Sequence, residues 1–343
     1  SPQRIAEDIK EKINLSEIEK VEVVSGYVNL FVKKDLYVKE ILEEIEKNKE
    51  EYGATKEGKG KKALIEHTSI NPNASPHIGR ARNALIGDAI VRLLKFNDYK
   101  VETHYFVNDI GKQISMLLVG TKNRDNVTFD ELLQIYIDIN KEVQENESLE
   151  QEVFANLNKL ENGDKETIEE FRKIVQICIE GQKAIFAELG IKYDYFDYES
   201  DFILNGTVNE ILEKLEKTGK LFEAEDGRLA INQEEYKIPM KAPVLVVTRA
   251  DKTSLYPLRD IAYSIYKANR NADKNIIVLG EDQKLYFKQI SAALDLLGYK
   301  APQVIHYSFV LLPDGKMSTR NGTVVLLEDF MKEILDKTKQ ELA

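Results

Sequence analysis

The chain has 343 residues, a formal net charge of −11 and 43% hydrophobic residues, which fits a folded protein of about two to three domains and excludes a mainly disordered one. No run reaches the ~18 apolar residues of a transmembrane helix, and the start is too polar for a signal peptide, so we expect a cytoplasmic protein without a membrane partner. The single cysteine, Cys178, excludes an internal disulfide, and the acidic charge argues mildly against a nucleic-acid binder, whose surface is normally basic.

The first 50 residues predict a small module of helix, strand, strand and helix. Apolar residues recur at near-helical spacing in 5–15 and again in 35–50, and they alternate as two short strands in 21–32. The Gly- and Lys-rich stretch 51–62 predicts an exposed linker, which we take as the first domain boundary.

From Ala63 the pattern changes to alternating strands and helices. A buried-type strand at 63–69 precedes a loop rich in Pro, Asn and Gly, an amphipathic helix at 80–97 and a second strand at 100–107. The apolar side of this helix is expected to hold Ala84, Leu85, Ile90, Val91 and Leu94. A strand, loop, helix and strand in this order begin a doubly wound sheet.

The middle of the chain interrupts this alternation. Residues 113–190 read as mostly helical, and Cys178 lies on a helical apolar stripe, which predicts a core position. Short strands follow, with a hairpin signal at Asp226-Gly227. The alternation resumes with strands at 244–248, 275–280 and 304–310 and with helices from about 258 and at 284–297. We therefore expect an insertion between two halves of a Rossmann-like sheet.

Two glycine-rich patterns imitate phosphate-binding loops. Residues 53–59 resemble the start of such a loop, but Gly60 stands where Ser or Thr must hold Mg²⁺. Residues 58–63 resemble a dinucleotide-binding fingerprint but precede the strand instead of following it. Both are interpreted as linker.

Two other segments carry more chemistry. Residues 76–80, Pro-His-Ile-Gly-Arg, lie between a strand and a helix start, where free backbone N–H groups and the helix dipole favour an anion. Residues 312–322 carry Lys316 and Arg320 in a Gly-containing loop, which suits a cationic clamp over a triphosphate. Taken singly, each segment has a plainer interpretation: His77 could be a structural histidine, and residues 312–322 could be a solvated basic turn.

Together, in this order at the two ends of a split α/β sheet, the segments resemble the HIGH and KMSKS signatures of class I aminoacyl-tRNA synthetases. The stretches YFVNDIGKQI, YPLRDIAY, LGEDQKLYF and KMSTRNGTVVLLEDF narrow the resemblance to arginyl-tRNA synthetases, over essentially the whole chain. The resemblance implies ATP-dependent activation of L-arginine to arginyl-adenylate and its transfer to the 3'-terminal adenosine of tRNA(Arg). It implies ATP and Mg²⁺ as cofactors, no residue-held metal, and a monomer.

The resemblance also implies an α/β fold class: a Rossmann-like catalytic domain split by a mostly helical insertion, with a small α+β N-terminal module. The expected divisions are a partial tRNA-binding module at 1–55, a linker at 56–62, the first catalytic half at 63–115, the insertion at 116–243, the second half at 244–327, and the start of a linker to an anticodon-binding domain at 328–343. Family members are longer at both ends, so a fragment is expected. They also usually need bound tRNA to activate arginine.

Site residues follow from the matched motifs. The expected catalytic residues are His77, Arg80, Lys316 and Arg320. The expected ATP-binding residues are His77, Gly79, Lys316, Met317 and Ser318. The expected arginine-binding residues are Glu66, Ser69, Asn71, Tyr256, Asp260 and Gln283. Glu66 and Asp260 would take the guanidinium, with Tyr256 beside it, because a planar fork of donors suits carboxylates. Asn71 and Gln283 would hold the α-amino group.

Neighbouring motif residues are given supporting roles. Asn108 and Asp109 are interpreted as structural or as support for the tRNA end, and Tyr105 and Phe106 as core.

The chain departs from the family pattern at three positions. Arg80 replaces the second histidine of HIGH, Thr319 replaces the second lysine of KMSKS, and Lys284 replaces a usual histidine. These changes leave open a synthetase-like paralogue that binds arginine, ATP or tRNA without efficient charging. A nucleotidyltransferase with a related histidine motif is disfavoured, because its chain would be far shorter and would lack YPLRDIAY.

Overall fold

The computed structural model describes residues 1–312, 315–316 and 325–342. By contacts it divides into two compact units, Ser1–Lys56 and Glu57–Ala343, which are treated separately below. Within the described residues, no helix is long and apolar enough to cross a membrane.

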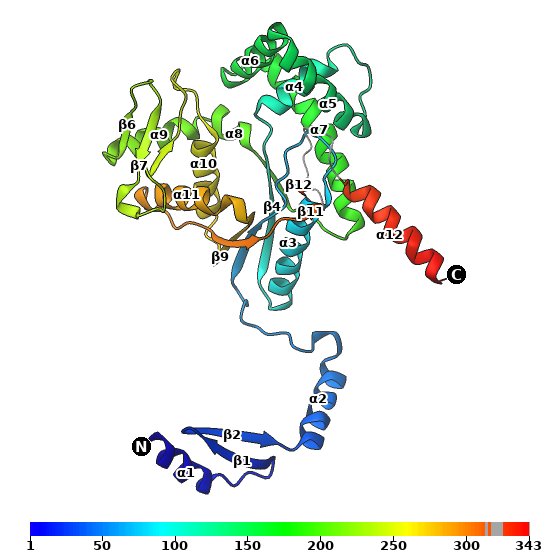
Figure 1. Ribbon diagram of the computed structural model, residues 1–343, viewed down its shortest axis with the longest axis vertical. Helices are drawn as coiled ribbons and strands as arrows, with labels where there is room; N and C mark the ends of the chain where they lie inside the picture. The colour runs from blue at the N-terminus through cyan, green and yellow to red at the C-terminus, as the bar shows by residue number, and fades with distance from the viewer. Residues whose placement is uncertain (313–314, 317–324, 343) are drawn as a thin grey trace. The chain divides into compact units, whose positions relative to one another are not determined.

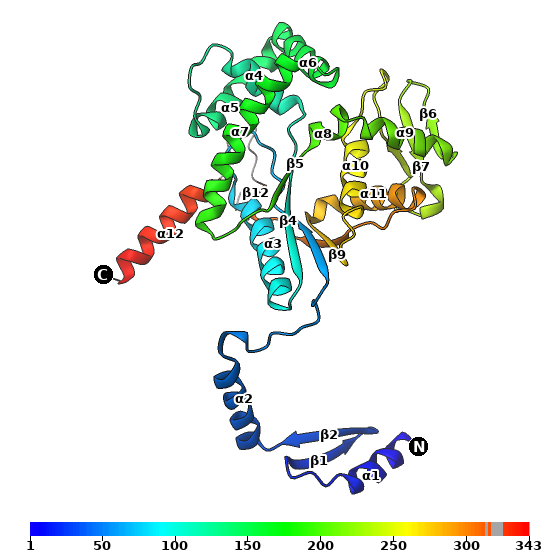
Figure 2. The ribbon, with the colours of Figure 1, turned by 180° about the vertical axis from the view of Figure 1, so that it is seen from behind.

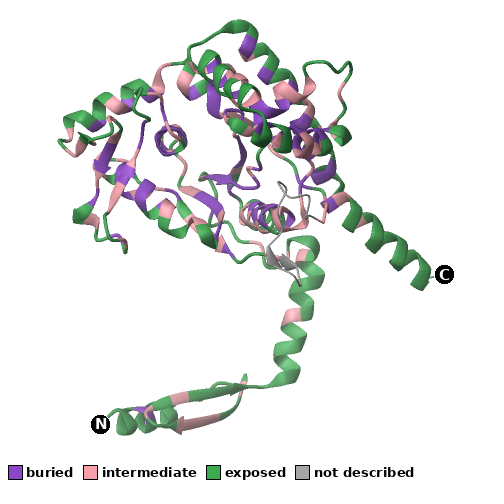
Figure 3. Cartoon of the chain, turned by 45° about the horizontal axis from the view of Figure 1, so that its top comes forward, coloured by how far each residue is buried: buried purple, intermediate pink, exposed green. Residues whose placement is uncertain are grey.

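The first unit consists of two helices and a hairpin. Its elements are α1 (Pro2–Lys12), β1 (Ile18–Val24), β2 (Tyr27–Val32) and α2 (Lys34–Asn48). The turn between the antiparallel strands places Ser25 and Gly26 at φ 54° and 84°, the left-handed conformations that a tight hairpin requires. Within residues 1–56, all of them described, only Ala6 is buried (Figure 3). The apolar stripes of both helices therefore face outward in this unit.

A five-stranded parallel sheet forms the centre of the second unit. Its strands are β3 (Lys62–Glu66), β4 (Lys100–Val107), β5 (Tyr195–Tyr198), β9 (Lys274–Gly280) and β10 (Gln303–Tyr307), in the spatial order β10-β9-β3-β4-β5. The order reverses at β3, whose neighbours are β4 on one side and β9 on the other. Ligands of such sheets bind at the carboxyl ends of the strands beside this reversal.

Helices cover both faces of the sheet, as alternation along β4 requires (Figures 1 and 2). Tyr105 belongs to the core on the side of α3 (Ile78–Phe96), whereas Phe106 belongs to the core on the side of α10 (Tyr256–Ala268) and α11 (Lys284–Leu296). Both aromatic residues are buried, which confirms the core prediction. Gly87 brings α3 close to β3, since a Cβ there would collide with the ring of His67.

The apolar face of α3 differs from the prediction at one position. Ala84 and Val91 are buried, but Leu85 is 49% exposed. Successive helical residues are ~100° apart, so the position after Ala84 turns away from the sheet. The prediction for Leu85 was wrong.

The helical part of the second unit has a core of its own. Its helices are α4 (Lys112–Thr121), α5 (Phe129–Glu145), α6 (Glu147–Glu161) and α7 (Lys165–Glu188), which gather to one side of the central sheet in Figures 1 and 2. Tyr136 and Cys178 are fully buried in this core, which confirms the core position of the cysteine.

A small antiparallel sheet lies on the other side. It follows α8 (Glu199–Leu204) and α9 (Thr207–Lys217) and consists of β6 (Leu221–Glu223), β7 (Leu229–Asn232) and β8 (Val244–Val246). The Asp226-Gly227 hairpin is confirmed, with Gly227 at φ 82° between β6 and β7.

Two strands join a different sheet from the one that the predicted insertion implied. The strand at 244–248 was expected to resume it, but β8 pairs antiparallel with β7 instead. Within the expected insertion, β5 pairs in parallel with β4, so this segment returns to the central sheet. Short strands carry too little pattern to reveal which sheet they join. The remaining elements are β11 (Leu311–Leu312), β12 (Gly315–Lys316) and α12 (Leu327–Leu342).

Candidate active site

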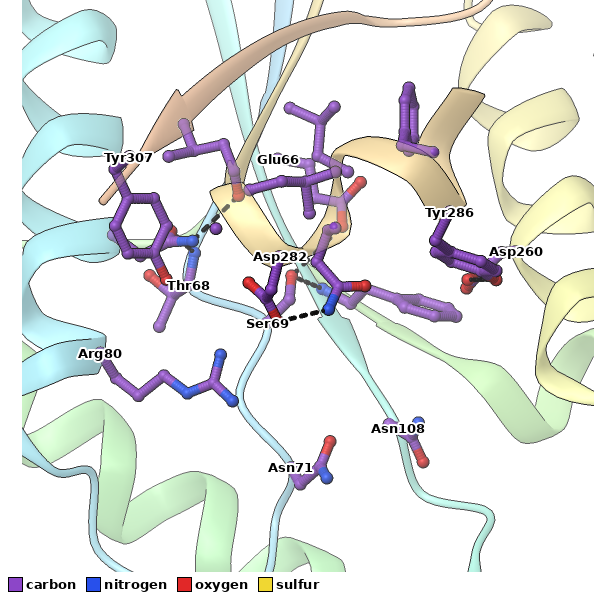
Figure 4. Close-up of a pocket in the computed structure, with 18 of the residues that line it drawn as sticks. Glu66, Thr68, Ser69, Asn71, Arg80, Asn108, Asp260, Asp282, Tyr286 and Tyr307 are labelled. Atoms are coloured by element: carbon purple, nitrogen blue, oxygen red, sulfur yellow. Dashed lines mark hydrogen bonds between the residues drawn. The ribbon is translucent and has the colours of Figure 1, made fainter. Parts of the chain in front are cut away.

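A pocket opens at the carboxyl ends of β3, β4, β9 and β10, beside the start of α3 and against α10 and α11 (Figure 4). Most of the residues expected from sequence meet there. Those lining the pocket are Glu66, Ser69, Asn71, His77, Gly79, Arg80, Asp260 and Gln283. Tyr256 does not line it: the residue is 54% exposed, and its ring packs against that of Tyr286, with centroids 5.3 Å apart.

The backbone immediately after β3 adopts an unusual conformation. Thr68 and Ser69 have φ values of 71° and 42°, which cost free energy for residues with side chains. Asn83 of α3 holds this segment: its Oδ1 accepts from the N–H of Thr68 at 2.6 Å, and its Nδ2 donates to the carbonyl of Val278 at 2.9 Å. The Ser69 hydroxyl accepts from the N–H of Phe106 at 3.1 Å. The pocket floor is thus pinned to three elements.

Glu66 ends β3 and is 4% exposed. One carboxylate oxygen makes a direct ion pair with Lys267 of α10, which is 1% exposed. The other oxygen accepts from the hydroxyl of Ser69 at 3.3 Å. Both oxygens of Glu66 are therefore engaged by this chain's own groups.

Asp260 lies on α10 beside Tyr286 of α11 (Figure 4). The Tyr286 hydroxyl donates to one oxygen of the carboxylate. Burial raises the pKa of Asp260 to about 6, against the lowering effect of this hydrogen bond. A carboxylate in such surroundings gains strongly from a cation.

Three further polar side chains extend the pocket wall. Gln283 donates to Asp282 at 2.7 Å, and the amide of Asn71 donates to Gln113 at 2.9 Å. Asn108 lines the pocket.

Its neighbour Asp109 is buried instead and accepts from both the N–H and the hydroxyl of Ser200, at 2.8 and 2.5 Å, which anchors the start of α8. Asp109 therefore has a structural role, one of the two roles anticipated for it.

His77 is the N-cap of α3. Its Nδ1 accepts from the N–H of Gly79 at 3.1 Å, so the ring proton is on Nε2. Burial and the nearby Arg80 lower the pKa of His77 to about 4, which keeps the imidazole neutral at pH 7. Within the described part of the chain, the Arg80 guanidinium has no hydrogen-bond or ion-pair partner. A neutral N–H donor and a charged guanidinium thus stand together in the pocket wall, which suits a phosphate.

The helix start itself differs from expectation. Free backbone N–H groups were predicted there, but the N–H of Ile78 donates to the carbonyl of Val325 at 3.0 Å, and that of Gly79 is taken by His77. The first turn is occupied because the returning chain pairs with it.

Residues 325–328, which follow the second motif segment in sequence, return to the first segment. The N–H of Leu327 donates to Pro76 at 2.8 Å, and the hydroxyl of Ser75 donates to Glu328 at 2.7 Å. Lys316 lies in the short strand β12. Met317, Ser318, Thr319 and Arg320 lie outside the described residues.

Among the polar residues that line the pocket, those that sequence reasoning missed include Asn83, Lys267 and Tyr286. Asn83 and Lys267 are buried polar residues on the inner faces of α3 and α10, where apolar residues would be expected. A polar residue within an apolar helical stripe was the available signal. Across the described ranges no group of three or more His, Cys, Asp or Glu residues is placed to hold a metal ion.

Comparisons with known proteins agree on one family. Residues 40–343 match the family described as tRNA synthetases class I (R), catalytic domain, and residues 1–32 match the arginyl tRNA synthetase N terminal domain. The chain is 36% identical to the arginine–tRNA ligase of Methanocaldococcus jannaschii, covering 99% of this chain and 61% of that protein. It is 38% identical to that of Methanosphaera stadtmanae, covering 100% of this chain and 60% of the relative. The chain thus spans about three fifths of the length of these relatives.

Solved structures show the same fold. The arginyl-tRNA synthetase of Thermus thermophilus superposes with a TM-score of 0.81 at 23% identity, covering 99% of this chain and 62% of that one. The enzyme of Plasmodium falciparum superposes with a TM-score of 0.74 at 20% identity, covering 99% and 58%.

Proposed function

Because the chain belongs to the class I arginyl-tRNA synthetase family, we propose that it acts as an arginine–tRNA ligase. It would join L-arginine to ATP, release pyrophosphate, and pass the arginyl group from arginyl-adenylate to the 3'-terminal adenosine of tRNA(Arg). The observation that carries the proposal is a pocket with a partly buried carboxylate, Asp260, at one side and the Arg80 cation with the imidazole of His77 at the other. Such a pocket suits a guanidinium and a polyphosphate together.

Asp260 would hold the guanidinium. A carboxylate whose pKa is raised by burial gains most from a fixed cation, and a guanidinium can bond both of its oxygens. Lysine would pair less well, because its ammonium is a point charge. A neutral side chain would leave the carboxylate unpaired. The α-amino group would be held by Asn71 and Gln283, with Ser69 beside it and Tyr256 at the rim.

His77 and Arg80 would bind the triphosphate, with Gly79 against the nucleoside. The imidazole has its donor on Nε2, and Arg80 brings a positive charge. The second motif would add further contacts to the triphosphate, from Lys316, Met317, Ser318 and Arg320. The reaction needs no covalent intermediate, so these residues would act by aligning the arginine carboxylate with the α-phosphate and by neutralising charge. Magnesium also stays a prediction, resting on the phosphate oxygens of ATP, which bind it readily.

We also propose that the protein is a monomer and lies in the cytoplasm. Residues 1–55 are proposed to contact tRNA, a role supported by the match of residues 1–32 to the family's N-terminal domain.

Arginine-dependent exchange between ATP and pyrophosphate tests the proposed function. With tRNA(Arg) added, we expect exchange with L-arginine and about hundredfold less with L-lysine, because the ammonium cannot pair bidentately. Without tRNA, we expect less exchange, as the family resemblance implies. A folded protein with no exchange under either condition would leave only a synthetase-like binding protein.

A further inference from the structure

Residues 325–328 link the start of α12 to the loop that precedes α3. The backbone of Leu326 forms an antiparallel bridge with that of His77. The N–H of the residue after His77 donates to the carbonyl of Val325 at 3.0 Å, and the carbonyl of the residue before it accepts from the N–H of Leu327 at 2.8 Å. The backbone around His77 is thus fixed on both sides by a segment far along the chain.

The position of His77 in turn sets that of the cation in the pocket. In the first turn of α3, the carbonyl of His77 accepts from the N–H of Arg80 at 2.8 Å. His77 and Arg80 line the pocket, whereas residues 325–328 do not. A displacement of that segment would therefore reach the proposed triphosphate site through the backbone, although the segment is no part of the pocket wall.

One side-chain hydrogen bond spans this link. The hydroxyl of Ser75 donates to Oε1 of Glu328 at 2.7 Å, and both residues are partly buried. The neighbouring Leu327 is 3% exposed and packs in the core on the α3 side, so apolar contact also holds the segment. Apolar contact has no preferred direction, whereas a hydrogen bond does. The bond to Glu328 is therefore suited to fix where the segment lies along the loop.

The earlier part of the same loop is held by a different helix. Gln182 of α7, 1% exposed, donates to the carbonyl of Ala74 at 2.9 Å and accepts from the hydroxyl of Tyr105 at 2.6 Å. Ala74 is thus tied to α7 and β4. The next three residues, 75–77, are instead hydrogen-bonded or bridged to residues 326–328. The part of the loop that ends at His77 is placed by the start of α12.

We propose that Glu328 is a positioning residue for the nucleotide. Its hydrogen bond to Ser75 keeps the start of α12 in register with the loop and so places His77 and Arg80 for the triphosphate. The proposal rests on the proposed function and adds to it a residue outside the pocket. It also couples α12 to the nucleotide site: ATP binds best when the link is made, so bound ATP stabilises the link in return.

A plainer role for Glu328 can be separated from this one by matched variants. Glu328 and Asp329 both lie in the first turn of α12, where negative charge interacts favourably with the helix dipole. Glu328→Gln removes the charge but keeps a carbonyl oxygen that can accept from Ser75. Glu328→Ala removes both the charge and the acceptor. Asp329→Ala, at an exposed position, removes a charge from the same turn and is the matched control.

The test is the affinity for ATP, measured with Mg²⁺ by isothermal titration calorimetry on the full chain and its variants. Glu328→Ala and Ser75→Ala are each expected to bind ATP about tenfold more weakly, and the double variant no more weakly than either, because all three lose the same hydrogen bond. Glu328→Gln should stay within about threefold of the unmodified chain, and Asp329→Ala should match it. The affinity for L-arginine should be the same in all of them, which a general loss of structure would not allow.

Ser75→Ala breaks the bond from the side of the loop, so it decides the question if Glu328→Ala does not fold. Unchanged ATP affinity in the folded variants would overturn the proposal. An equal loss in Glu328→Gln and Glu328→Ala, or a loss as large in Asp329→Ala, would also overturn it, because the effect would then come from charge at the helix start. An unmodified chain that binds no ATP would instead contradict the proposed function.

Discussion

Individual residues of the pocket owe their chemistry to their surroundings. Glu66 and Asp260 are both carboxylates at the pocket, and the sequence offers no way to rank them. The structure gives Glu66 a buried ammonium and leaves Asp260 with a hydroxyl. Whether a carboxylate is available to a ligand is decided by residues distant in sequence, such as Lys267, 201 positions from Glu66.

The pKa of Asp260 predicts a pH dependence of arginine binding. A guanidinium pairs with the ionised carboxylate, so affinity should be constant above about pH 6 and fall by up to about tenfold per pH unit below it. Tyr286→Phe removes the hydrogen bond that lowers this pKa, so the fall should begin at a higher pH. The measurement is the arginine dissociation constant from pH 5 to 8. Equal profiles for both proteins would contradict the role of Asp260.

The same group affects stability with a definite sign. The folded protein keeps the Asp260 proton up to about pH 6, whereas an unfolded chain loses it near the ordinary aspartate pKa of 3.8. Folding therefore binds a proton in this window, and the contribution of Asp260 to stability falls as the pH rises through it. Bound arginine, which favours the ionised form, offsets that loss.

At the scale of elements, α3 joins the first motif segment to residues that follow the second in sequence. It begins at the His77 cap, and the segment before α12 pairs with the same loop through Ile78 and Val325. Arg82, one turn further on, donates to the carbonyl of Ser308 at 2.8 Å, just past β10. Strand-to-helix patterns predicted α3 well. Its pairing with residues 325–328 could not be predicted, because a long-range backbone contact leaves no periodicity in sequence.

His77 has two roles that matched variants should separate. Asn at position 77 keeps a good N-cap for α3 but removes the Nε2 donor, whereas Ala removes both. His77→Asn is expected to retain the thermal stability of the protein and to lose pyrophosphate exchange by about a hundredfold. His77→Ala should lose the same activity and also about 1 kcal/mol of stability. Thermal unfolding measures the stability, and the exchange assay measures the activity. A His77→Asn variant with undiminished pyrophosphate exchange would show that His77 only caps α3.

Over the whole molecule, the fold could be predicted from sequence where the apolar pattern of a helix or strand extends over many residues. The helices at 165–188 and 284–296 and the strands β3, β4 and β9 lie close to their predicted positions. The strand β8 was expected in the central sheet, and β5 was placed in the insertion without a partner, since three or four residues specify no partner. Net charge was a weak guide, because it sums surface and interior and cannot locate the buried carboxylate of Asp260. Family motifs, not composition, brought Asp260 and His77 to attention.

The central claim is that Asp260 recognises a guanidinium, and calorimetric titration of L-arginine and its neutral isostere L-citrulline tests it most directly. We predict that the unmodified chain binds arginine at least about a hundredfold more tightly than citrulline, and that Asp260→Asn removes this preference by weakening arginine alone. Equal affinities for the two amino acids in the unmodified chain, or an undiminished preference for arginine in Asp260→Asn, would contradict it.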